Sequence, residues 1–268
     1  MTKSPRPPAA LLDAVCELAL QAGAKALEIY HSDFASEQKA DASPVTDADR
    51  MGEEIILAGL QKLAPEIPVL AEESASEGDI PDLGDEFFLV DPLDGTKEFI
   101  KKTGEFTVNI ALVQNGRPAL GVVYAPALGA LYAGVKDMGA WIARLNQEGL
   151  VGPRKPIAAR NVPKSDLVAV ASRSHRSPET DEYLKEMRVK DFAAAGSSLK
   201  FCLIAEGKAD IYPRFGRTME WDTGAGQAVL EAAGGVVLTY PDKQILAYGK
   251  KSRGFDNPYF IAWGAKAG

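Results

Sequence analysis

Carboxylates stand beside an apolar run near position 90, in a spacing that suits a metal ion. The apolar residues 87–90 predict a buried strand, and the segment DPLDGTKEF at 91–99 begins where that strand should end. Asp91 and Asp94 would therefore face one site, with the backbone carbonyl of Leu93 between them. Such an all-oxygen ligand set suits Mg²⁺. For the isolated motif, a turn with an aspartate cap is the alternative interpretation.

Acidic residues elsewhere in the chain could complete this site. Glu72 and Glu73 follow the apolar residues 68–71, and Asp222 lies in WDTGAG at 221–226. Buried acids are costly unless they are paired, protonated or bound to metal, so these positions favour a divalent cation site. Because side chains alternate along a strand, only one of the adjacent pair should face the site, and Glu72 is the expected ligand. Asp222 is expected to cap the following helix and to supply a fourth carboxylate; taken alone, it is an ordinary helix cap.

The chemistry that fits this arrangement best is hydrolysis of a phosphate ester. Two cations about 3.5–4 Å apart can lower the pKa of an attacking water and stabilise the oxygen that leaves. The Asp49 carboxylate and the Thr96 hydroxyl could pass the water's proton, while Glu72 orients the water. Asp49 has the alternative role of capping its helix. Gly95 allows a tight turn, and Thr96 would begin a helix whose free N–H groups hold a phosphate.

Composition places the chain among folded, acidic proteins. Its 268 residues are 46% hydrophobic, enough for one large domain or for two of about 100 to 150 residues each. The net charge of −7 and the scattered Lys and Arg residues argue against a basic face that would hold a nucleic-acid polymer. Cys16 and Cys202 are too few for a disulfide framework or a thiolate zinc site, and we expect both to be apolar helix residues.

Neither a secretion signal nor a membrane span is expected from the sequence. The N-terminal MTKSPRPP has no apolar signal core, and no run approaches the roughly 18 apolar residues of a membrane helix. We therefore expect a cytoplasmic enzyme and leave open whether it also touches the cytoplasmic face of the inner membrane. Its oligomeric state is left open as well.

Hydrophobic periodicity predicts helices and strands in a mixed α/β order. The first half should contain two amphipathic helices, then strands with a hairpin at Asn115-Gly116, and the second half should alternate strands with helices. The predicted helices are 9–30, 47–63 (starting at 47 or 49), 179–187, 197–206 and 223–233, and the predicted strands are 67–71, 87–90, 106–114, 119–125, 130–135, 168–172, 209–212 and 236–239. The 149–156 stretch is the expected boundary between an N-terminal α+β half, 1–150, with most of the metal ligands, and a C-terminal α/β half, 151–268, which completes the site and the substrate pocket.

The order of the motifs along the chain resembles that of a known enzyme family. Four segments carry the resemblance across nearly the whole chain: Thr46-Asp47-Ala48-Asp49, Glu72-Glu73-Ser74, DPLDGTKEF and WDTGAGQAVLEAAGG. They are similar to the lithium-sensitive, magnesium-dependent phosphomonoesterases of the inositol monophosphatase superfamily. Three longer stretches, at 89–113, 172–175 and 196–215, look like the branch of bacterial 3′(2′),5′-bisphosphate nucleotidases.

This resemblance implies a fold, an activity and a set of residues. The implied fold, of α/β (α+β) class, is a layered α/β/α/β/α sandwich with the site between its halves. The implied reaction is hydrolysis of adenosine 3′,5′-bisphosphate to AMP and phosphate in sulfur metabolism, with the sulfated precursor of this nucleotide as a further substrate. The implied ligands of two or three Mg²⁺ ions are Glu72, Asp91, the Leu93 carbonyl, Asp94 and Asp222. Asp49 and Thr96 would activate the water, with Glu72 assisting, and the implied substrate contacts are Leu93, Asp94, Gly95, Thr96, Ser197, Ser198, Lys200 and Asp222.

A second phosphate on the substrate would require cations near the motifs. The available cations are Lys97, Lys101, Lys102, Arg173, Lys200 and Arg214, each of which has the alternative of being a surface charge. Ser197 and Ser198 at a predicted helix start could bind phosphate or adenine, or simply cap the helix. His31 and His175 are expected outside the metal site, and Trp221 is expected to pack.

Two other functions remain open at this point. An inositol-1-phosphatase or fructose-1,6-bisphosphatase would share the metal ligands and differ only in the pocket beyond them. A sensor that binds nucleotide and cation without turnover would be expected to lack one of the acids, and none of them is missing from the sequence.

Overall fold

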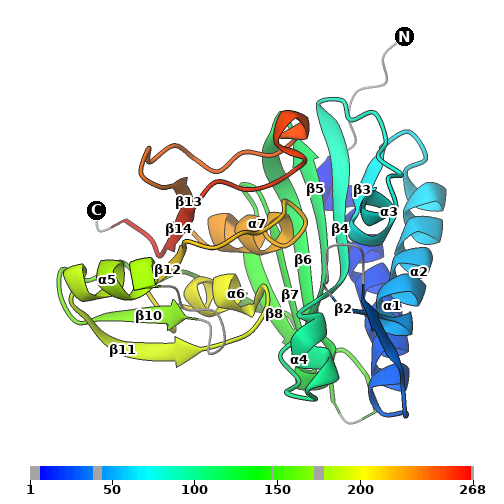
Figure 1. The fold of residues 1–268 in the computed structure, drawn as a ribbon, viewed down its shortest axis with the longest axis horizontal. Helices are drawn as coiled ribbons and strands as arrows, with labels where there is room; N and C mark the ends of the chain where they lie inside the picture. The colour runs from blue at the N-terminus through cyan, green and yellow to red at the C-terminus, as the bar shows by residue number, and fades with distance from the viewer. Residues whose placement is uncertain (1–6, 39–43, 147, 172–177, 267–268) are drawn as a thin grey trace.

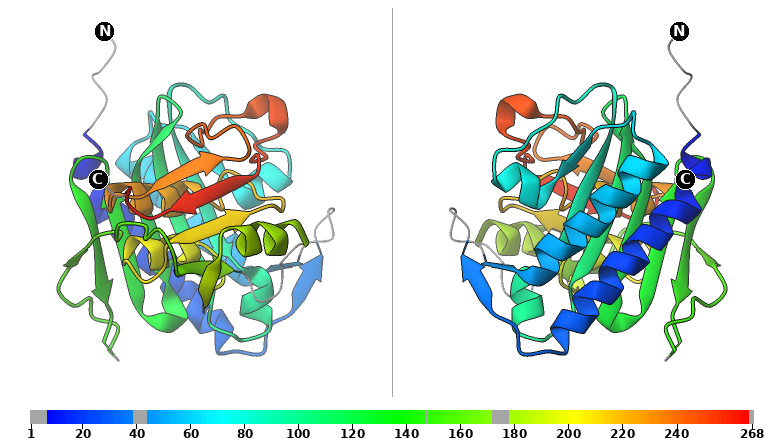
Figure 2. Two further views of the ribbon diagram at one scale, coloured as in Figure 1. Left: turned by 90° about the vertical axis from the view of Figure 1, so that its left-hand side faces the viewer. Right: turned by 90° about the vertical axis from the view of Figure 1, so that its right-hand side faces the viewer.

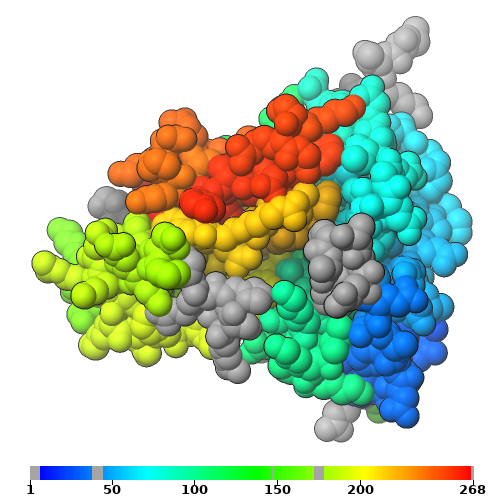
Figure 3. All heavy atoms as spheres, viewed as in Figure 1, coloured from blue at the N-terminus to red at the C-terminus, as the bar shows by residue number. Residues whose placement is uncertain are grey.

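The computed structural model describes residues 7–38, 44–146, 148–171 and 178–266. Figure 1 shows that helices and sheets alternate in five layers within these ranges. On the surface drawn in Figure 3, N-terminal segments in cyan and green border C-terminal segments in yellow, orange and red. Residues far apart in the sequence therefore meet along one face of the molecule.

The first layer consists of two long helices, α1 (Leu12–Tyr30) and α2 (Asp47–Leu63), which lie side by side in the right-hand view of Figure 2. Both predicted amphipathic helices are thus confirmed. Their apolar side chains, such as Val15 and Ile56, pack on one face of the larger sheet, where Val90 lies. The packing fixes the start of α2, and with it Asp49, relative to the strand that carries Asp91 and Asp94.

The second layer is a seven-stranded sheet with the strand order β3-β4-β5-β6-β7-β8-β9. The β3–β4 pair is parallel, and the remaining neighbours are antiparallel. Asn115 and Gly116 both have positive φ, 51° and 71°, at the turn between β5 and β6, which confirms the predicted hairpin. The strands are β3 (Val69–Ala71), β4 (Glu86–Asp94), β5 (Thr107–Gln114), β6 (Arg117–Ala125), β7 (Ala130–Val135), β8 (Gly139–Arg144) and β9 (Lys155–Ile157).

The third layer, α6 (Leu199–Ala205) and α7 (Gly224–Ala232), covers the other face of this sheet. Helix α7 lies so close to the sheet that a Cβ on Gly121 would come within 2.4 Å of the Ala225 carbonyl oxygen. Only a glycine on the strand allows this approach. The close packing holds the chain around Asp222 against the strands that carry the other acids.

The fourth layer is a five-stranded sheet with the strand order β11-β10-β12-β14-β13. The fifth layer is α5 (Pro178–Glu186), whose Leu184 packs on Ala169, Ile211 and Phe215 at the outer face of this sheet. The strands are β10 (Leu167–Ala171), β11 (Val189–Ala194), β12 (Ile211–Arg214), β13 (Val236–Thr239) and β14 (Phe260–Trp263). The expected layered α/β/α/β/α sandwich is confirmed.

Short elements surround these layers. They are the strand pair β1 (Ser36–Gln38) and β2 (Pro44–Thr46), the helices α3 (Glu72–Ser76) and α4 (Thr96–Ile100), and the 3₁₀ turns Pro8–Ala10, Pro126–Leu128 and Lys251–Arg253. No helix in the described ranges is long and apolar enough to span a membrane. Cys16 on α1 and Cys202 on α6 are buried free thiols, as expected.

Several predicted boundaries differ from the structure. Strand β4 does not end at Val90 but continues to Asp94, because a register shift between Asp91 and Asp94 lets it stay paired with β5. Strands β1, β2, β8, β9, β11 and β14 were not predicted; β11 is largely exposed and has no apolar run to signal it. The chain passes from the larger sheet to the smaller one between β9 and β10. The division into domains 1–150 and 151–268 stays a prediction.

Candidate active site

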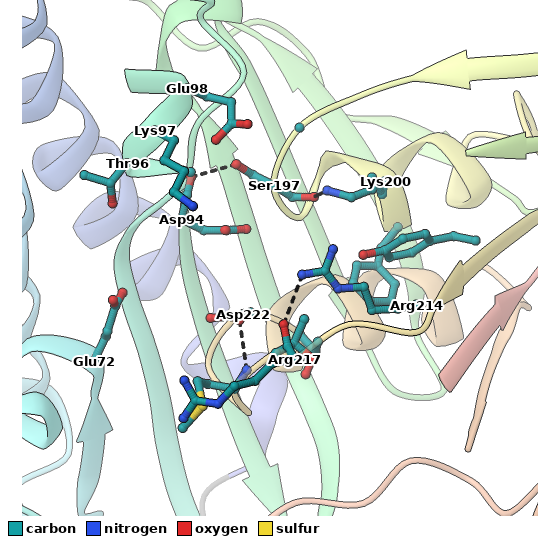
Figure 4. Close-up of a pocket in the computed structure, with 17 residues that line it drawn as sticks. Glu72, Asp94, Thr96, Lys97, Glu98, Ser197, Lys200, Arg214, Arg217 and Asp222 are labelled. Carbon is teal, nitrogen blue, oxygen red and sulfur yellow. Dashed lines mark hydrogen bonds between the residues drawn. The ribbon is translucent and has the colours of Figure 1, made fainter. Parts of the chain in front are cut away.

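A cavity of about 430 Å³ opens where the two halves of the chain meet (Figure 4). Its N-terminal side is formed by Glu72, Asp94, Gly95, Thr96, Lys97 and Glu98. Its C-terminal side is formed by Gly196, Ser197, Lys200, Phe201, Tyr212, Arg214, Arg217, Thr218, Met219, Asp222 and Thr223. Carboxylates and cations therefore face the same space, the arrangement that a phosphate with its counter-ions needs.

The DPLDGT segment forms an irregular end to β4. Asp91 pairs with Asn109 and Asp94 with Thr107 on β5, while the two residues between them bulge out of the ladder. The Leu93 N–H donates a hydrogen bond to Asp91 Oδ1 at 3.0 Å, which holds the bulge closed. Both aspartates thus lie near the end of β4, where Asp94 lines the cavity and Asp91 is buried outside its lining. That both ligate one metal site stays a prediction.

Gly95 joins β4 to the short helix α4. Its φ of 94° lies in the left-handed region that favours glycine, and an added Cβ would come 2.2 Å from Ser197 Oγ. The Ser197 hydroxyl lies 2.7 Å from the Asp94 carbonyl oxygen and 2.9 Å from that of Glu105. Glycine at this position therefore allows the two halves of the chain to touch at the cavity floor.

Burial and mutual repulsion dominate the electrostatics of the acids. Burial raises the pKa of Asp91 well above its usual value, and the negative charges of Glu72, Asp94 and Asp222 raise it further. Burial also raises the pKa of Asp94, against the opposing effects of Lys200 and of hydrogen bonds from Ser198. Burial and the charge of Asp94 raise the pKa of Asp222 to about 7. Repelling carboxylates of this kind are stabilised by a cation between them.

The donor set fits a hard divalent cation, although the ligands do not form a closed cage. No three or more His, Cys, Asp or Glu side chains of the described residues stand as a group that could hold a metal ion. The buried Thr107 Oγ1 and Asn109 Oδ1, on the strand beside Asp94 and Asp91, have no hydrogen-bond partner among the described residues. The carboxylate oxygens suit magnesium, and these two unsatisfied oxygens mark a polar cluster that is incomplete on its own.

Asp49 and Thr96 form a hydrogen-bonded pair beside the cavity. The Thr96 hydroxyl donates to Asp49 Oδ1 at 3.1 Å. Asp49 is fully buried, and its other oxygen accepts from the N–H and the hydroxyl of Thr46, at 2.8 and 2.7 Å, in a capping box at the start of α2. The two roles considered for Asp49, helix cap and partner of Thr96, are thus combined in one side chain. Only Thr96 of the pair lines the cavity.

Glu72 lines the cavity and Glu73 does not, but the predicted reason was wrong. The two residues do not end a strand; they begin α3, so strand alternation does not separate them. Glu73 is buried, and its N–H donates to the carboxylate of Glu53 on α2. Glu53 was not identified from the sequence, because its partners lie twenty residues further along the chain.

Asp222 lies at the cavity but does not cap α7, which corrects the expectation. The N-cap residue of this helix is Thr223, and its side chain makes no capping bond. Asp222 Oδ2 accepts instead from the Met219 N–H at 2.9 Å, and its carbonyl accepts from the Ser198 hydroxyl at 2.9 Å. The carboxylate is therefore held by the turn before the helix. Trp221 packs in the core, as expected.

The expected cations fall into two groups. Lys97, Lys200 and Arg214 line the cavity, whereas Lys101 and Lys102 on the same side of the molecule do not. Lys200 Nζ donates to the Ser197 carbonyl at 2.8 Å, and Arg214 Nη2 donates to the Arg217 carbonyl at 3.0 Å. Arg217, which was not predicted, also lines the cavity and pairs with Asp256. Arg173 and His175 lie outside the described residues.

Ser197 and Ser198 are placed differently from each other. Ser197 lines the cavity, whereas Ser198 is buried and occupies the N-cap position of α6 without a side-chain capping bond. The hydroxyls of both serines bind backbone carbonyls at the junction of the two halves. A direct contact of either hydroxyl with substrate stays a prediction.

The fold and the site together define a layered α/β/α/β/α protein with a cavity lined by both carboxylates and cations where its two halves meet. The chain matches the inositol monophosphatase family over residues 8–260, and it belongs to this family. The crystal structure of CysQ from Bacteroides thetaiotaomicron, a bacterial member of the family, superposes with a TM-score of 0.79 at 41% identity, covering 95% of this chain and 97% of that one.

Curated relatives and other solved structures refine this placement. The 3′(2′),5′-bisphosphate nucleotidase CysQ of Shigella flexneri is 45% identical over 93% of this chain and 98% of its own length. The protein of the same name from Escherichia coli K12 is 44% identical with the same coverage. The inositol monophosphatase from Anabaena is 27% identical, with a TM-score of 0.74 over 96% of this chain and 91% of that one. The chain is thus more similar to the nucleotidases than to this inositol phosphatase.

Proposed function

We propose that this chain is a magnesium-dependent 3′(2′),5′-bisphosphate nucleotidase. It would hydrolyse the 3′-phosphate of adenosine 3′,5′-bisphosphate to give AMP and phosphate, and would also accept the sulfated precursor of that nucleotide. The observation that carries the proposal is the cavity itself, where Asp94 and Asp222 face Lys200 and Arg214. The identity of 45% to a bisphosphate nucleotidase supports this substrate over inositol-1-phosphate, the alternative.

We assign the binding of two or three Mg²⁺ ions to Glu72, Asp91, Asp94, Asp222 and the Leu93 carbonyl. When bound, magnesium supplies positive charge that lowers the pKa of the attacking water and offsets charge on the phosphate. The assignment rests on the raised pKa values of Asp91 and Asp222, because carboxylates that repel one another in a buried site lose that cost when a cation joins them.

The residues of the chain then orient the water and take its proton. The Thr96 hydroxyl, already donating to Asp49 at 3.1 Å, can accept the water's proton as it passes its own to the carboxylate. The Gly95 and Thr96 N–H groups at the start of α4 would hold the phosphate. Attack forms a bond between phosphorus and the water oxygen and breaks the bond between phosphorus and the 3′ oxygen, which leaves as a hydroxyl after taking up a proton from solvent water.

The C-terminal side of the cavity would hold the rest of the nucleotide. Ser197, Lys200 and Arg214 lie across the cavity from Thr96, and Arg214 Nε is buried without a hydrogen-bond partner among the described residues. We infer that these groups bind the second phosphate and the nucleoside. The expected partner is thus a small nucleotide. A cytoplasmic location, with or without contact to the inner membrane, is also a proposal.

Turnover of three substrates tests the reaction. With Mg²⁺, the purified chain should hydrolyse adenosine 3′,5′-bisphosphate with a higher kcat/KM than inositol-1-phosphate or fructose-1,6-bisphosphate. A preference for inositol phosphate would replace the proposed substrate with the alternative. No phosphate release from any small phosphomonoester would favour a sensor that binds without turnover.

Arg214→Ala tests which cations bind the second phosphate. Loss of a charge-assisted hydrogen bond costs about 1.5–3 kcal/mol, so KM for the bisphosphate should rise roughly 10- to 150-fold, with a smaller change for adenosine 3′-monophosphate. Lys101→Ala is the matched control, because this cation lies outside the cavity, and its kinetics should equal those of the parent. Equal effects of the two substitutions on the bisphosphate would exclude Arg214 from the phosphate subsite.

A further inference from the structure

We propose that Glu53 is a positioning residue for the metal site, which it controls through Glu72. The inference rests on the proposed function only in taking Glu72 as a magnesium ligand. Glu53 lies on α2, and it is not among the residues that line the cavity. Its carboxylate is directed instead at the backbone of the chain that follows Glu72.

The contacts of Glu53 are short and specific. Its Oε2 accepts from the Glu73 N–H at 2.8 Å. Its Oε1 accepts from the Ser74 N–H at 2.8 Å and from the Ser74 hydroxyl at 2.5 Å. Only 4% of the residue is exposed, so water does not compete for these bonds. One buried carboxylate thus binds three donors of the two residues that come directly after the ligand.

Helix α3 needs such an acceptor because it cannot cap itself. It has five residues, and its N-cap residue, Ala71, has no side chain that could accept a hydrogen bond. The N–H groups of its first turn would remain unpaired at the buried Glu73 and the partly buried Ser74. The carboxylate of Glu53 satisfies two of them and places a negative charge at the positive end of the turn.

Glu72 is therefore held from both sides along the backbone. On one side, Ala71 pairs with Val90 in the parallel β3–β4 ladder, one residue before Asp91. On the other side, Glu53 fixes Glu73 and Ser74. The side chain of Glu72 reaches the cavity from this clamped segment (Figure 4). Groups that orient a metal ligand in this way typically contribute 10- to 100-fold to metal affinity.

The test measures Mg²⁺ binding directly, by calorimetric titration of the purified full chain without substrate. Glu53→Gln keeps the shape of the side chain but turns an NH₂ group toward one of the backbone N–H donors, so α3 should shift. Mg²⁺ affinity should fall about 10- to 100-fold. Glu54→Gln is the matched control, since it makes the same charge change at the next, exposed residue of α2, and its affinity should equal that of the parent.

A double variant distinguishes positioning from a general loss of stability. If Glu53 acts through Glu72, then Glu53→Gln should reduce Mg²⁺ affinity strongly in the parent and little when Glu72→Gln is already present. Equal losses in both backgrounds would overturn the inference, as would an unchanged affinity of Glu53→Gln. If Glu53→Gln does not fold, Ser74→Ala removes only the hydroxyl bond and should give a smaller loss of the same kind; an unchanged affinity there would also overturn the inference.

The titration separates this inference from the proposed function. A chain that binds Mg²⁺ but releases no phosphate from the bisphosphate nucleotide would refute the function and leave the role of Glu53 measurable. A parent chain that shows no Mg²⁺ binding in the titration would refute the positioning role itself.

Discussion

The two sides of the cavity are built in different ways. The sheet wall, which we define as the cavity-lining Glu72, Asp94 and Thr96 together with the buried Asp91 on the strand of Asp94, follows from the β3–β4–β5 ladder with its irregular end and from the short helices that start there. The loop wall, defined as Ser197, Lys200, Arg214 and Asp222, lies at the start of α6, at the end of β12 and on the chain between β12 and α7. Backbone ladder bonds hold the strands of the first wall, with Glu53 and Asp49 fixing the short helices beside them. Buried polar side chains hold the second wall.

The loop wall depends on a segment much further along the chain. Glu220 is fully buried and accepts from the N–H groups of Gly249 and Lys250, at 2.7 and 2.8 Å, and from Lys250 Nζ at 2.8 Å. Asn257 Nδ2 donates to the Met219 carbonyl at 2.7 Å, and to the hydroxyls of Thr218 and Thr223 at 3.2 and 3.1 Å. These bonds fasten the turn that carries Asp222.

Because the two walls are held differently, substitutions in them should affect different properties of the protein. A backbone ladder survives the loss of one side chain, so the sheet wall can carry acids that repel one another. In the loop wall, removal of one buried polar group leaves its partners unsatisfied, which is costly. Substitutions in the sheet wall should therefore act mainly on activity, and substitutions behind the loop wall mainly on the free energy of unfolding.

The largest expected effect is that of Asp91→Ala or Asp94→Ala on turnover. Loss of one ligand should remove about 4 kcal/mol of transition-state stabilisation, so kcat/KM should fall by roughly 10³-fold or more. The fold should survive, because the substitution also removes a repelling charge. Initial rates with Mg²⁺ and thermal melts measure the two effects. Normal turnover in either variant would refute the site. An unfolded variant would contradict the claim that substitutions in the sheet wall act mainly on activity.

Glu220→Ala should show the opposite pattern. It leaves two backbone N–H groups without their acceptor and Lys250 Nζ, which still donates to the Ala247 carbonyl, without its counter-charge, at a cost of about 3 kcal/mol in the free energy of unfolding. The cost corresponds to a Tm lower by roughly 6–12 °C in a chain of this size. The folded fraction should keep more activity than Asp91→Ala.

The control for this substitution is Glu231→Ala on α7. Glu231 also forms an ion pair, with Arg117 at 2.7 Å, but both side chains are partly exposed. Such a pair contributes less than about 1 kcal/mol, so Tm should change little. If the two substitutions lowered Tm equally, burial of the Glu220 network would not be what holds the loop wall.

The sheet wall could be predicted from the sequence because its cues are local. An apolar run followed by two aspartates, a glycine and a threonine indicates a strand end, a turn and a helix start within ten residues. A shared role of Asp49 and Thr96 in proton transfer was proposed from their chemistry, and the hydrogen bond between them comes from the structure. The helical start at Glu72 was missed, since the apolar residues before it indicate only a strand.

The loop wall could not be predicted beyond the presence of Asp222. The acid was recognised, but its bond to the Met219 N–H depends on a turn that the C-terminal segment holds from a distance. Glu53 and Glu220 were missed for the same reason. Their partners lie about twenty to thirty residues away in sequence. The residues next to a single buried glutamate form no pattern from which its partners could be predicted.

The smallest expected effect is on the pH dependence of stability. It involves both walls, because Asp94 of the sheet wall acts on the pKa of Asp222 of the loop wall. The pKa of Asp222 is raised to about 7, with Asp94 as the main charge responsible, so the folded chain binds this proton more tightly than the unfolded chain does. Without metal, stability should therefore rise as the pH falls from 8 toward 5.5, by a few degrees in Tm.

Added Mg²⁺ should reverse this trend, because protons and the cation compete for the same carboxylates. The rise in Tm on adding Mg²⁺ should thus be larger at pH 8 than at pH 5.5. Thermal melts with EDTA and with Mg²⁺ at both pH values measure this, and Asp222→Asn serves as the control, since it removes one of the titrating acids and should weaken the dependence. A metal-free chain that is more stable at pH 8 than at pH 5.5 would show that the pKa of Asp222 is not raised in the folded chain. The electrostatic argument for a cation shared between the two walls would then be refuted.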